Sequence, residues 1–397
     1  MQRILFMAFL LLSLMVCLTS SAWAGGLDDA QAGATAFRGG NYDEAIRFFT
    51  KAIAFGELTR EQLKAAHALR GLAWDHKGDY DKAIVDYNRA IEINPDAAAY
   101  YNRGLAWYDK GDHDKALVDF TKAVELSPTY IAAYNNRGNI YDSRGDYDKA
   151  IADYTKAIQI NPKDPFAYSN RGSVWGKKDD YDKAIVDLNT AIEIEPKYAS
   201  AYSNRGIIWE KKGNHDKAIA DYTKAIEIEP KLTNAYYNRG NAWVNKGDYD
   251  KAIADWTKAI EINPKHGAAY NNRGQAWSKK GVYNKSIADF VKAIEIDPKH
   301  ANAYNGLAWL MATCPDDKYR DGKRAIELAE KASKLEETSF ILNTLGAAYA
   351  EAGRFQDAIK TQERAITKRK QEGGPQALTE FEEHLSSYKA GKPWREK

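Results

Sequence analysis

Small and aromatic residues recur along this chain at helical spacing, in a pattern that repeats from unit to unit. Residues 233–264 contain two such stretches, with Tyr236, Gly240 and Trp243 on one face of the first and Ala252, Trp256 and Ala259 on one face of the second. Gly247-Asp248 separates them, because Gly suits the position after a helix end and Asp suits the next helix cap. Asn263-Pro264 ends the second stretch. The pattern therefore predicts a helix hairpin.

The same unit recurs at a step of 34 residues, with a single step of 33 residues. The Gly of an Arg-Gly pair marks each copy, at Gly71, Gly104, Gly138, Gly172, Gly206, Gly240 and Gly274. A closing proline follows in each, at Pro95, Pro128, Pro162, Pro196, Pro230, Pro264 and Pro298. A fixed period of this length indicates a stacked-repeat solenoid.

The unit resembles the tetratricopeptide repeat. Counted from the first residue of each unit, positions 4, 8, 11, 20, 24, 27 and 32 hold Tyr236, Gly240, Trp243, Ala252, Trp256, Ala259 and Pro264, as that family expects. Seven successive near-copies make the resemblance specific. It implies an all-α, right-handed superhelical solenoid of about ten helix-turn-helix repeats with a C-terminal capping helix.

The pattern also predicts the organisation of the chain. We expect a signal peptide over residues 1–24, a degenerate repeat and link over 25–63, seven regular repeats over 64–300, a divergent repeat with a longer inter-helix loop over 301–338, a last repeat over 339–372, and a capping helix and tail over 373–397. Leu378, Phe381, Leu385 and Tyr388 mark the apolar face of the capping helix. We expect the polar tail from Lys389 to be mobile.

The N-terminus has the composition of a secretory signal peptide. Arg3 precedes an apolar run over residues 4–18, which is too short to span a bilayer, and Ala22-Trp23-Ala24 offers small residues around a cleavage site. The alternatives are an uncleaved anchor and a lipoprotein site at Cys17. Cleavage after Ala24 predicts a periplasmic or extracellular protein of bacterial type, with no integral membrane span.

Charge and motif content narrow the function. Without Arg3, 56 basic residues face 55 acidic ones, so no global field favours nucleic acid. No Gly-rich phosphate loop, nucleophile motif or metal-binding cluster occurs, so we expect neither an enzyme nor a cofactor. Without Cys17, Cys314 is the one cysteine, either buried or paired between chains.

Arginine and aspartate occur together in repeats two to eight. Position 7 holds Arg70, Arg103, Arg137, Arg171, Arg205, Arg239 and Arg273, and position 23 holds Asp86, Asp119, Asp153, Asp187, Asp221, Asp255 and Asp289. In repeat nine both positions become leucine, at Leu307 and Leu328. Joint presence and loss predict structural pairs between the two helices of a hairpin; a ligand-binding arginine row is the alternative.

Position 6 holds asparagine in six successive repeats, at Asn102, Asn136, Asn170, Asn204, Asn238 and Asn272. Helix propensity does not explain this choice, and an amide side chain both donates and accepts hydrogen bonds. The row is similar to the asparagine ladder of the O-linked N-acetylglucosamine transferase repeat domain. It predicts solvent-facing amides that grip the backbone of a peptide; the alternative is bonding to neighbouring helices or water.

The sequence thus predicts a non-catalytic scaffold or adaptor whose concave groove binds an extended peptide or protein segment. Asp109 and Asp142 in early repeats, and Lys177, Lys211 and Lys279 in later ones, would give that groove opposite charges at its ends. One alternative is a structural assembly protein of the cell envelope that uses its convex face or ends. Another is carbohydrate binding, for which Tyr101, Phe166 and Tyr237 are the aromatic candidates. The aromatic row at position 11, from Trp74 to Trp277, is interpreted as core.

Overall fold

The computed structural model describes residues 25–372 and 378–396 and confirms the all-α prediction. These residues form twenty-one α-helices and one short 3-10 helix, without a strand. None of the helices within these ranges combines the length and the apolar character needed to cross a membrane. The predicted signal peptide lies outside the described residues, and its cleavage remains a prediction.

The chain divides into two compact units, with the boundary between Lys197 and Tyr198. The first contains five hairpins: α2 (Gly25–Arg38) with α3 (Tyr42–Phe55), α4 (Arg60–His76) with α5 (Tyr80–Ile93), α6 (Ala97–Lys110) with α7 (His113–Leu126), α8 (Ile131–Ser143) with α9 (Tyr147–Ile160), and α10 (Pro165–Lys177) with α11 (Tyr181–Ile194). Within this unit, successive hairpins also pack on each other, through contacts such as those of α5 with α6 and α9 with α10.

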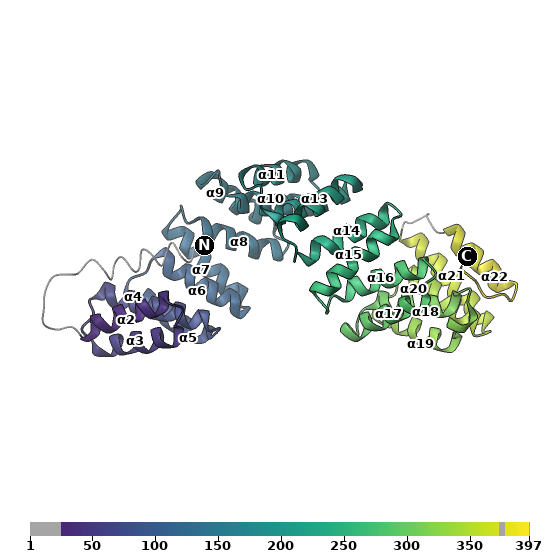
Figure 1. Ribbon diagram of the computed structural model, residues 1–397, viewed down its shortest axis with the longest axis horizontal. Coiled ribbons are helices and arrows are strands. Elements are labelled where there is room, and N and C mark those ends of the chain that lie inside the picture. The colour runs from purple at the N-terminus through teal and green to yellow at the C-terminus, as the bar shows by residue number, and fades with distance from the viewer. Residues whose placement is uncertain (1–24, 373–377, 397) are drawn as a thin grey trace. The chain divides into compact units, whose positions relative to one another are not determined.

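The second unit contains another five hairpins and a final helix (Figure 1). They are α12 (Ala199–Lys211) with α13 (His215–Ile228), α14 (Thr233–Asn245) with α15 (Tyr249–Ile262), α16 (Gly267–Lys279) with α17 (Tyr283–Ile296), α18 (Ala301–Thr313) with α19 (Gly322–Leu335), α20 (Ser339–Glu351) with α21 (Phe355–Gln371), and then α22 (Leu378–Lys389). The paired helices and the contacts between successive pairs are those of an α-solenoid.

The glycine at position 8 makes room for an aromatic ring. A Cβ atom at Gly240 would lie 2.6 Å from Nε1 of Trp256, which is 2% exposed in the core of the α14–α15 hairpin. Ala252 and Ala259 are fully buried beside this ring. The small residue therefore admits a large side chain from the second helix, and the close approach is between backbone and ring.

The N-terminal link is shorter than the sequence pattern suggested. We expected regular structure to resume at residue 64, whereas α4 begins at Arg60. The side chain of Thr59 accepts a hydrogen bond from the Gln62 backbone N–H, and the Gln62 side chain accepts one from the Thr59 backbone. This capping box satisfies amide groups of the first turn and extends the helix toward the preceding hairpin.

The longer loop of repeat nine is packed against the unit. It contains the 3-10 helix Asp317–Tyr319, after which Arg320 Nη1 donates to the Cys314 carbonyl oxygen at 2.8 Å. Arg320 Nε also reaches a carboxylate oxygen of Glu351 at 3.1 Å. Cys314 is 2% exposed, and burial raises the pKa of its thiol. The sequence left two alternatives open for this cysteine, a buried thiol and a thiol paired between chains. The structure shows a buried thiol.

Helix α22 covers the last hairpin. Phe381 and Tyr388 are each 1% exposed: Phe381 packs with Leu342 and Ile366, while Tyr388 packs with small residues of α20. The sequence pattern placed Leu385 on this face and missed His384, which is fully buried. Nδ1 of His384 lies 2.8 Å from the side-chain oxygen of Asn343.

The buried histidine predicts a pH-dependent stability of the cap. Burial lowers the pKa of His384 to about 4, against an opposing effect of Glu396, while an unfolded histidine titrates near 6.5. A folded pKa below the unfolded one means that stability is fully present above pH 6.5 and declines as the pH falls toward 4. From this shift we expect His384→Gln to reduce the loss of folding free energy between pH 7 and pH 4 by up to roughly 3 kcal/mol.

Chemical denaturation of the wild type and the His384→Gln variant across this pH range checks the expectation. Each protein is compared with itself at pH 7, so any pH-independent cost of the substitution cancels. The exposed His113 on α7 provides the control, and His113→Gln should follow the wild-type profile. Parallel profiles for wild type and His384→Gln would assign the acid sensitivity to other groups.

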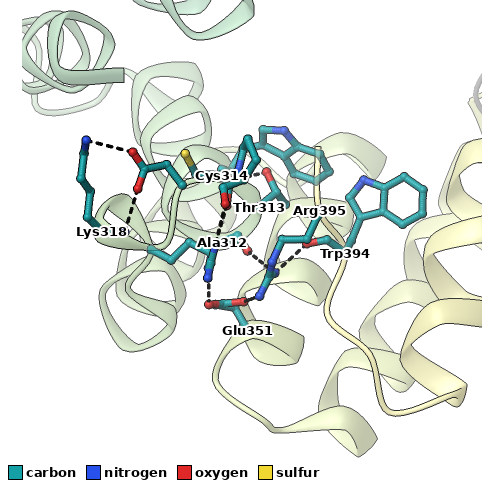
Figure 2. Close-up of polar contacts among 11 residues, drawn as sticks. Ala312, Thr313, Cys314, Lys318, Glu351, Trp394 and Arg395 are labelled. Carbon is teal, nitrogen blue, oxygen red and sulfur yellow. Dashed lines mark hydrogen bonds and ion pairs between the residues drawn. The ribbon is translucent and has the colours of Figure 1, made fainter. Parts of the chain in front are cut away.

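The segment after α22 differs from the expectation of a mobile tail. Arg395 lies between the Glu351 carboxylate and the carbonyl oxygen of Ala312 (Figure 2). The indole of Trp394 lies with its centroid 4.2 Å from the His384 ring. A polar composition suggested solvent exposure, whereas the side chains of Arg395 and Glu396 have partners on the repeats.

Candidate functional site

In repeats three to ten, the first helix carries a stripe at positions 6, 9 and 13, which lie three and four residues apart and therefore share one helix face. We call this stripe the asparagine face. In the first unit it comprises Asn102, Leu105 and Asp109; Asn136, Asn139 and Ser143; and Asn170, Ser173 and Lys177. In the second it comprises Asn204, Ile207 and Lys211; Asn238, Asn241 and Asn245; Asn272, Gln275 and Lys279; Gly306, Trp309 and Thr313; and Thr344, Ala347 and Glu351.

In the first unit, two position-6 asparagines bond to the preceding repeat. Asn136 Nδ2 donates to the Tyr101 hydroxyl at 2.9 Å, and Asn170 Nδ2 donates to Asn139 Oδ1 at 3.4 Å. Asn102 departs from the row, because it is only 3% exposed and its Nδ2 has no hydrogen-bond partner among the described residues. The amides of Asn136 and Asn170 are therefore held in fixed orientations, while Asn102 has little contact with solvent.

In the second unit, Asn272 shows the same connection to the repeat before it. Its Nδ2 donates to the Tyr237 hydroxyl at 3.2 Å and to Asn241 Oδ1 at 3.0 Å. Asn204 and Asn238 are half-buried on the neighbouring first helices. The prediction of freely solvated amides therefore needs correction: the row also links successive repeats, which was the alternative interpretation.

A hollow of about 320 Å³ opens beside Asn272. Its lining includes Asn241, Gln275 and Lys279 of the asparagine face, together with Tyr249; Trp256 also borders it but is only 2% exposed. Amide groups and aromatic rings thus meet at one place within the second unit. Such a surface offers hydrogen bonds to a polypeptide backbone and apolar contact to its side chains.

The charges expected on this face have partners. Lys177 Nζ lies 2.7 Å from the Asp142 carboxylate of the preceding repeat, and Lys279 Nζ lies 2.5 Å from that of Glu396.

The aromatic candidates for carbohydrate binding differ in their exposure to solvent. Tyr101 is 6% exposed, whereas Phe166 is 55% exposed.

The structure brings together every arginine and aspartate named as a structural pair. In each, arginine Nε donates to Asp Oδ2 at 2.8 Å and Nη2 donates to Oδ1 at 2.6–2.8 Å, as in Arg137–Asp153, Arg171–Asp187, Arg205–Asp221 and Arg239–Asp255. This two-point geometry fixes one helix of a hairpin against the other. In repeat nine, Leu307 and Leu328 are both 4% exposed and share one apolar cluster.

The arginines have a further partner that the sequence reasoning missed. Nη1 of Arg239 donates to the Thr223 hydroxyl of the preceding repeat at 2.9 Å, and Arg171 reaches Thr155 in the same way. Each of these side chains therefore joins three helices. The recurrence of threonine at position 25 was the available signal.

Burial makes the carboxylates dependent on these arginines. Asp119 is 2% exposed, and burial raises its pKa, although the hydrogen bonds from Arg103 oppose the shift. Keeping the charged carboxylate away from water therefore costs free energy, and loss of the arginine would leave the carboxylate unpaired. This geometry favours the structural role over a ligand-binding row.

The aromatic residues at position 11 are half-buried in the hairpins, and each is covered by a lysine. The Nζ atom of Lys251 lies 4.2 Å from the ring centroid of Trp243, and Lys217 lies 4.3 Å from that of Trp209. Both lysines come from the second helix of the same repeat. The rings thus lie between the hairpin core and a cation, an arrangement that leaves no open stacking platform at these two tryptophans.

These features define a class: units of stacked, similar helix hairpins, each unit with a regular row of polar side chains, are typical of an interaction scaffold. Tetratricopeptide repeat models match residues 97–130, 131–164, 199–232, 233–266, 267–300 and 341–375, and a TPR repeat model matches 76–111 and 176–213. Because these segments cover more than half of its length, the chain belongs to the tetratricopeptide repeat family. Proteins of this family generally act as non-catalytic scaffolds for protein partners.

Solved structures of repeat proteins are similar to parts of the chain. MamA is 32% identical with a TM-score of 0.37, and the match covers 41% of this chain and 95% of MamA. YrrB, described as a TPR protein with an unusual peptide-binding site, is 27% identical with a TM-score of 0.38, over 46% and 95% of the two chains. A tetratricopeptide repeat protein from Parabacteroides merdae is 22% identical with a TM-score of 0.48, over 64% and 98%. No curated protein matches the chain.

Proposed function

We propose that this protein is a scaffold that binds an extended peptide or protein segment along its asparagine face. The observation that carries the proposal is the hollow beside Asn272, where the amides of Asn241 and Asn272 lie next to aromatic side chains. An extended backbone presents alternating N–H and C=O groups, which match the donors and acceptors of a row of amides. Recognition of this kind depends little on the side chains of the bound segment.

Asparagine 238 is the most informative position for a test. It is half-buried on the asparagine face and makes no side-chain hydrogen bond within the described part of the chain. Asn238→Ala therefore removes an amide available to a peptide while leaving the contacts between repeats in place. One hydrogen bond contributes about 0.5–1.5 kcal/mol, so we expect peptide affinity to fall by at most roughly tenfold, with little change in melting temperature.

The measurement is a titration of fluorescein-labelled twelve-residue peptides of mixed, scrambled and proline-substituted sequence. Scrambled peptides should bind comparably and proline-substituted peptides more weakly, because proline lacks the backbone N–H. Asn284→Ala on α17, an exposed asparagine of a second helix, is the matched control and should bind like wild type. Equal affinities for wild type and Asn238→Ala would remove this amide from recognition and favour assembly through the ends or convex face.

Substitution of Asn272 should have a different signature. This amide donates to both Tyr237 and Asn241, so Asn272→Ala should lower the melting temperature as well as peptide affinity. The two variants thus separate the recognition role from the structural role that the contacts between repeats support.

We also propose that the protein is exported, which the N-terminal residue pattern supports. Mature protein isolated from its native host should begin at Gly25, after cleavage at the Ala22-Trp23-Ala24 site. N-terminal sequencing checks this expectation. Recovery of intact Met1 in the membrane fraction would instead support an uncleaved anchor.

A further inference from the structure

The chain's own C-terminal segment lies along part of the asparagine face. Trp394, Arg395 and Glu396 follow α22 and contact α20, α18 and α16, which are the first helices of repeats ten, nine and eight. The segment therefore runs in the direction opposite to the order of the repeats. Its residues engage position 9 or 13 of each repeat, as a bound peptide would in the function proposed above.

Glu396 has the largest number of contacts with this face. One carboxylate oxygen lies 2.5 Å from Lys279 Nζ, and the other accepts a hydrogen bond from Trp309 Nε1 at 2.5 Å. Its backbone N–H donates to the Thr313 carbonyl oxygen at 3.0 Å. The acidic side chain of Glu396 and its backbone N–H are thus recognised together.

Arg395 and Trp394 occupy the neighbouring places. Arg395 Nη2 lies 2.6 Å from the Glu351 carboxylate, whose side chain is 13% exposed, and Nη1 lies 3.5 Å from the Ala312 carbonyl oxygen (Figure 2). Trp394 packs against the buried cluster that contains Tyr388, as Trp309 does. The face therefore offers, in succession, a place for an aromatic ring, an acidic side chain for a cation and a basic side chain for a carboxylate.

These contacts have the chemistry of a sequence-selective site. Main-chain bonding alone would accept any extended segment, whereas Glu351, which Arg320 also contacts, favours a cation, and Lys279 with Trp309 favours a carboxylate in the next position. The side chain of Lys279 is 59% exposed and that of Glu396 is 31% exposed, so a competing segment can reach this end of the site from solvent. Because the tail is covalently attached, a weak affinity for the face is enough to keep it bound.

We propose that the face formed by α16, α18 and α20 is a binding site for an extended partner segment with aromatic, basic and acidic residues in succession, and that the tail occupies it as an intramolecular ligand. This inference rests on the proposed function and adds the chemistry of the segment to it. A partner segment must displace the tail. A tethered ligand acts at an effective concentration in the millimolar range, so the tail strongly reduces binding of a free segment.

The test uses a chain that ends at Lys392, which keeps α22 and removes the five residues that follow. The probe is a fluorescein-labelled peptide Ala-Gly-Lys-Pro-Trp-Arg-Glu-Lys, the sequence of residues 390–397. Fluorescence anisotropy should show saturable binding to the shortened chain and at least tenfold weaker binding to the intact chain. Circular dichroism confirms that the shortened chain is folded.

A charge exchange tests the assignment of residues. The peptide with Glu396→Lys should bind the shortened chain at least tenfold more weakly and should regain affinity for a shortened chain that carries Lys279→Glu. In the intact chain, Glu396→Lys should loosen the tail and increase binding of the unchanged peptide. This last variant retains full length, so it provides a second measurement if the shortened chain folds poorly.

Equal binding of the peptide to intact and shortened chains, or binding to neither, would overturn the inference. Binding that ignores the charge exchange would overturn the assignment of Lys279 and Glu396. The result is independent of the asparagine test, because Asn238 makes none of the tail contacts. If Asn238→Ala binds peptides like the wild type while the tail peptide still binds the shortened chain, only the proposed recognition of a peptide backbone by the position-6 amides is rejected.

Discussion

Replacement of Arg239 by leucine should lower the stability of the second unit by roughly 3–5 kcal/mol, the usual cost of removing one partner of a buried ion pair. Arg239 gives Asp255 two hydrogen bonds, and the Asp255 side chain is 8% exposed. Without the arginine, the carboxylate remains buried and loses the ion-pair partner that the structure gives it. Thr223 of the preceding repeat also loses the hydrogen bond from Arg239.

Arg239→Leu combined with Asp255→Leu should recover much of this loss. Replacing both members of a buried pair by apolar residues is often nearly neutral, and repeat nine already has Leu307 and Leu328 at these positions. The Thr223 bond stays lost in the double variant, so recovery should be incomplete. Because repeat arrays do not always unfold in two states, hydrogen exchange in α14 and α15 should accompany thermal and chemical denaturation.

The matched control is Lys258→Leu on α15, which removes an exposed pair with Glu261. Surface pairs of this kind contribute little, so a change below about 1 kcal/mol is expected. A double Arg239/Asp255 variant that melts no higher than the worse of the two single variants would show that the pair is not the source of the stability.

Removal of the capping helix should have an effect of similar or larger size. A chain ending at Gly374 loses Phe381, His384 and Tyr388, all of which are buried against the last hairpin. Leu342 and Ile366 then face solvent at the end of the stack. Terminal repeats need a polar outer surface, so we expect a lower melting temperature and self-association, measured by light scattering.

Two variants separate the helix from the tail. Phe381→Ala keeps the whole chain and should cost roughly 3–5 kcal/mol, as for other buried phenylalanines. The chain ending at Lys392 keeps α22, and we expect it to stay monomeric. A well-behaved monomer after removal of α22 would show that this helix is not needed to cover the stack.

Local sequence pattern was sufficient for the hairpins, because glycine at position 8 and the aromatic residue at position 24 meet within one repeat, as Gly240 and Trp256 do. The Arg–Asp contacts could be inferred for a different reason: both residues are lost together in repeat nine. The capping helix followed from its apolar spacing. These features all lie within a few dozen residues along the chain.

The remaining features depend on contacts that no local pattern encodes. Lys279 and Glu396 are 117 residues apart in sequence, so the polar composition of the tail gave no indication of its docking. His384 was missed because burial of a histidine depends on an acceptor from another helix, here Asn343. The amides at position 6 were expected to face solvent, since the sequence did not reveal their bonds to the preceding repeat.

The bond from Arg239 to the preceding repeat, which recurs at Arg171 and Arg273, has a consequence for how such a chain can grow. Repeat seven supplies Arg239 for Thr223 behind it and Thr257 for Arg273 ahead of it. A whole unit of this kind therefore carries one donor for its predecessor and one acceptor for its successor. Duplication of the corresponding stretch of gene, in register, would insert a new repeat that continues this series of bonds. Repeat nine, with leucines at both positions of the pair, lacks the arginine donor, and insertion directly before it would not extend the series of bonds.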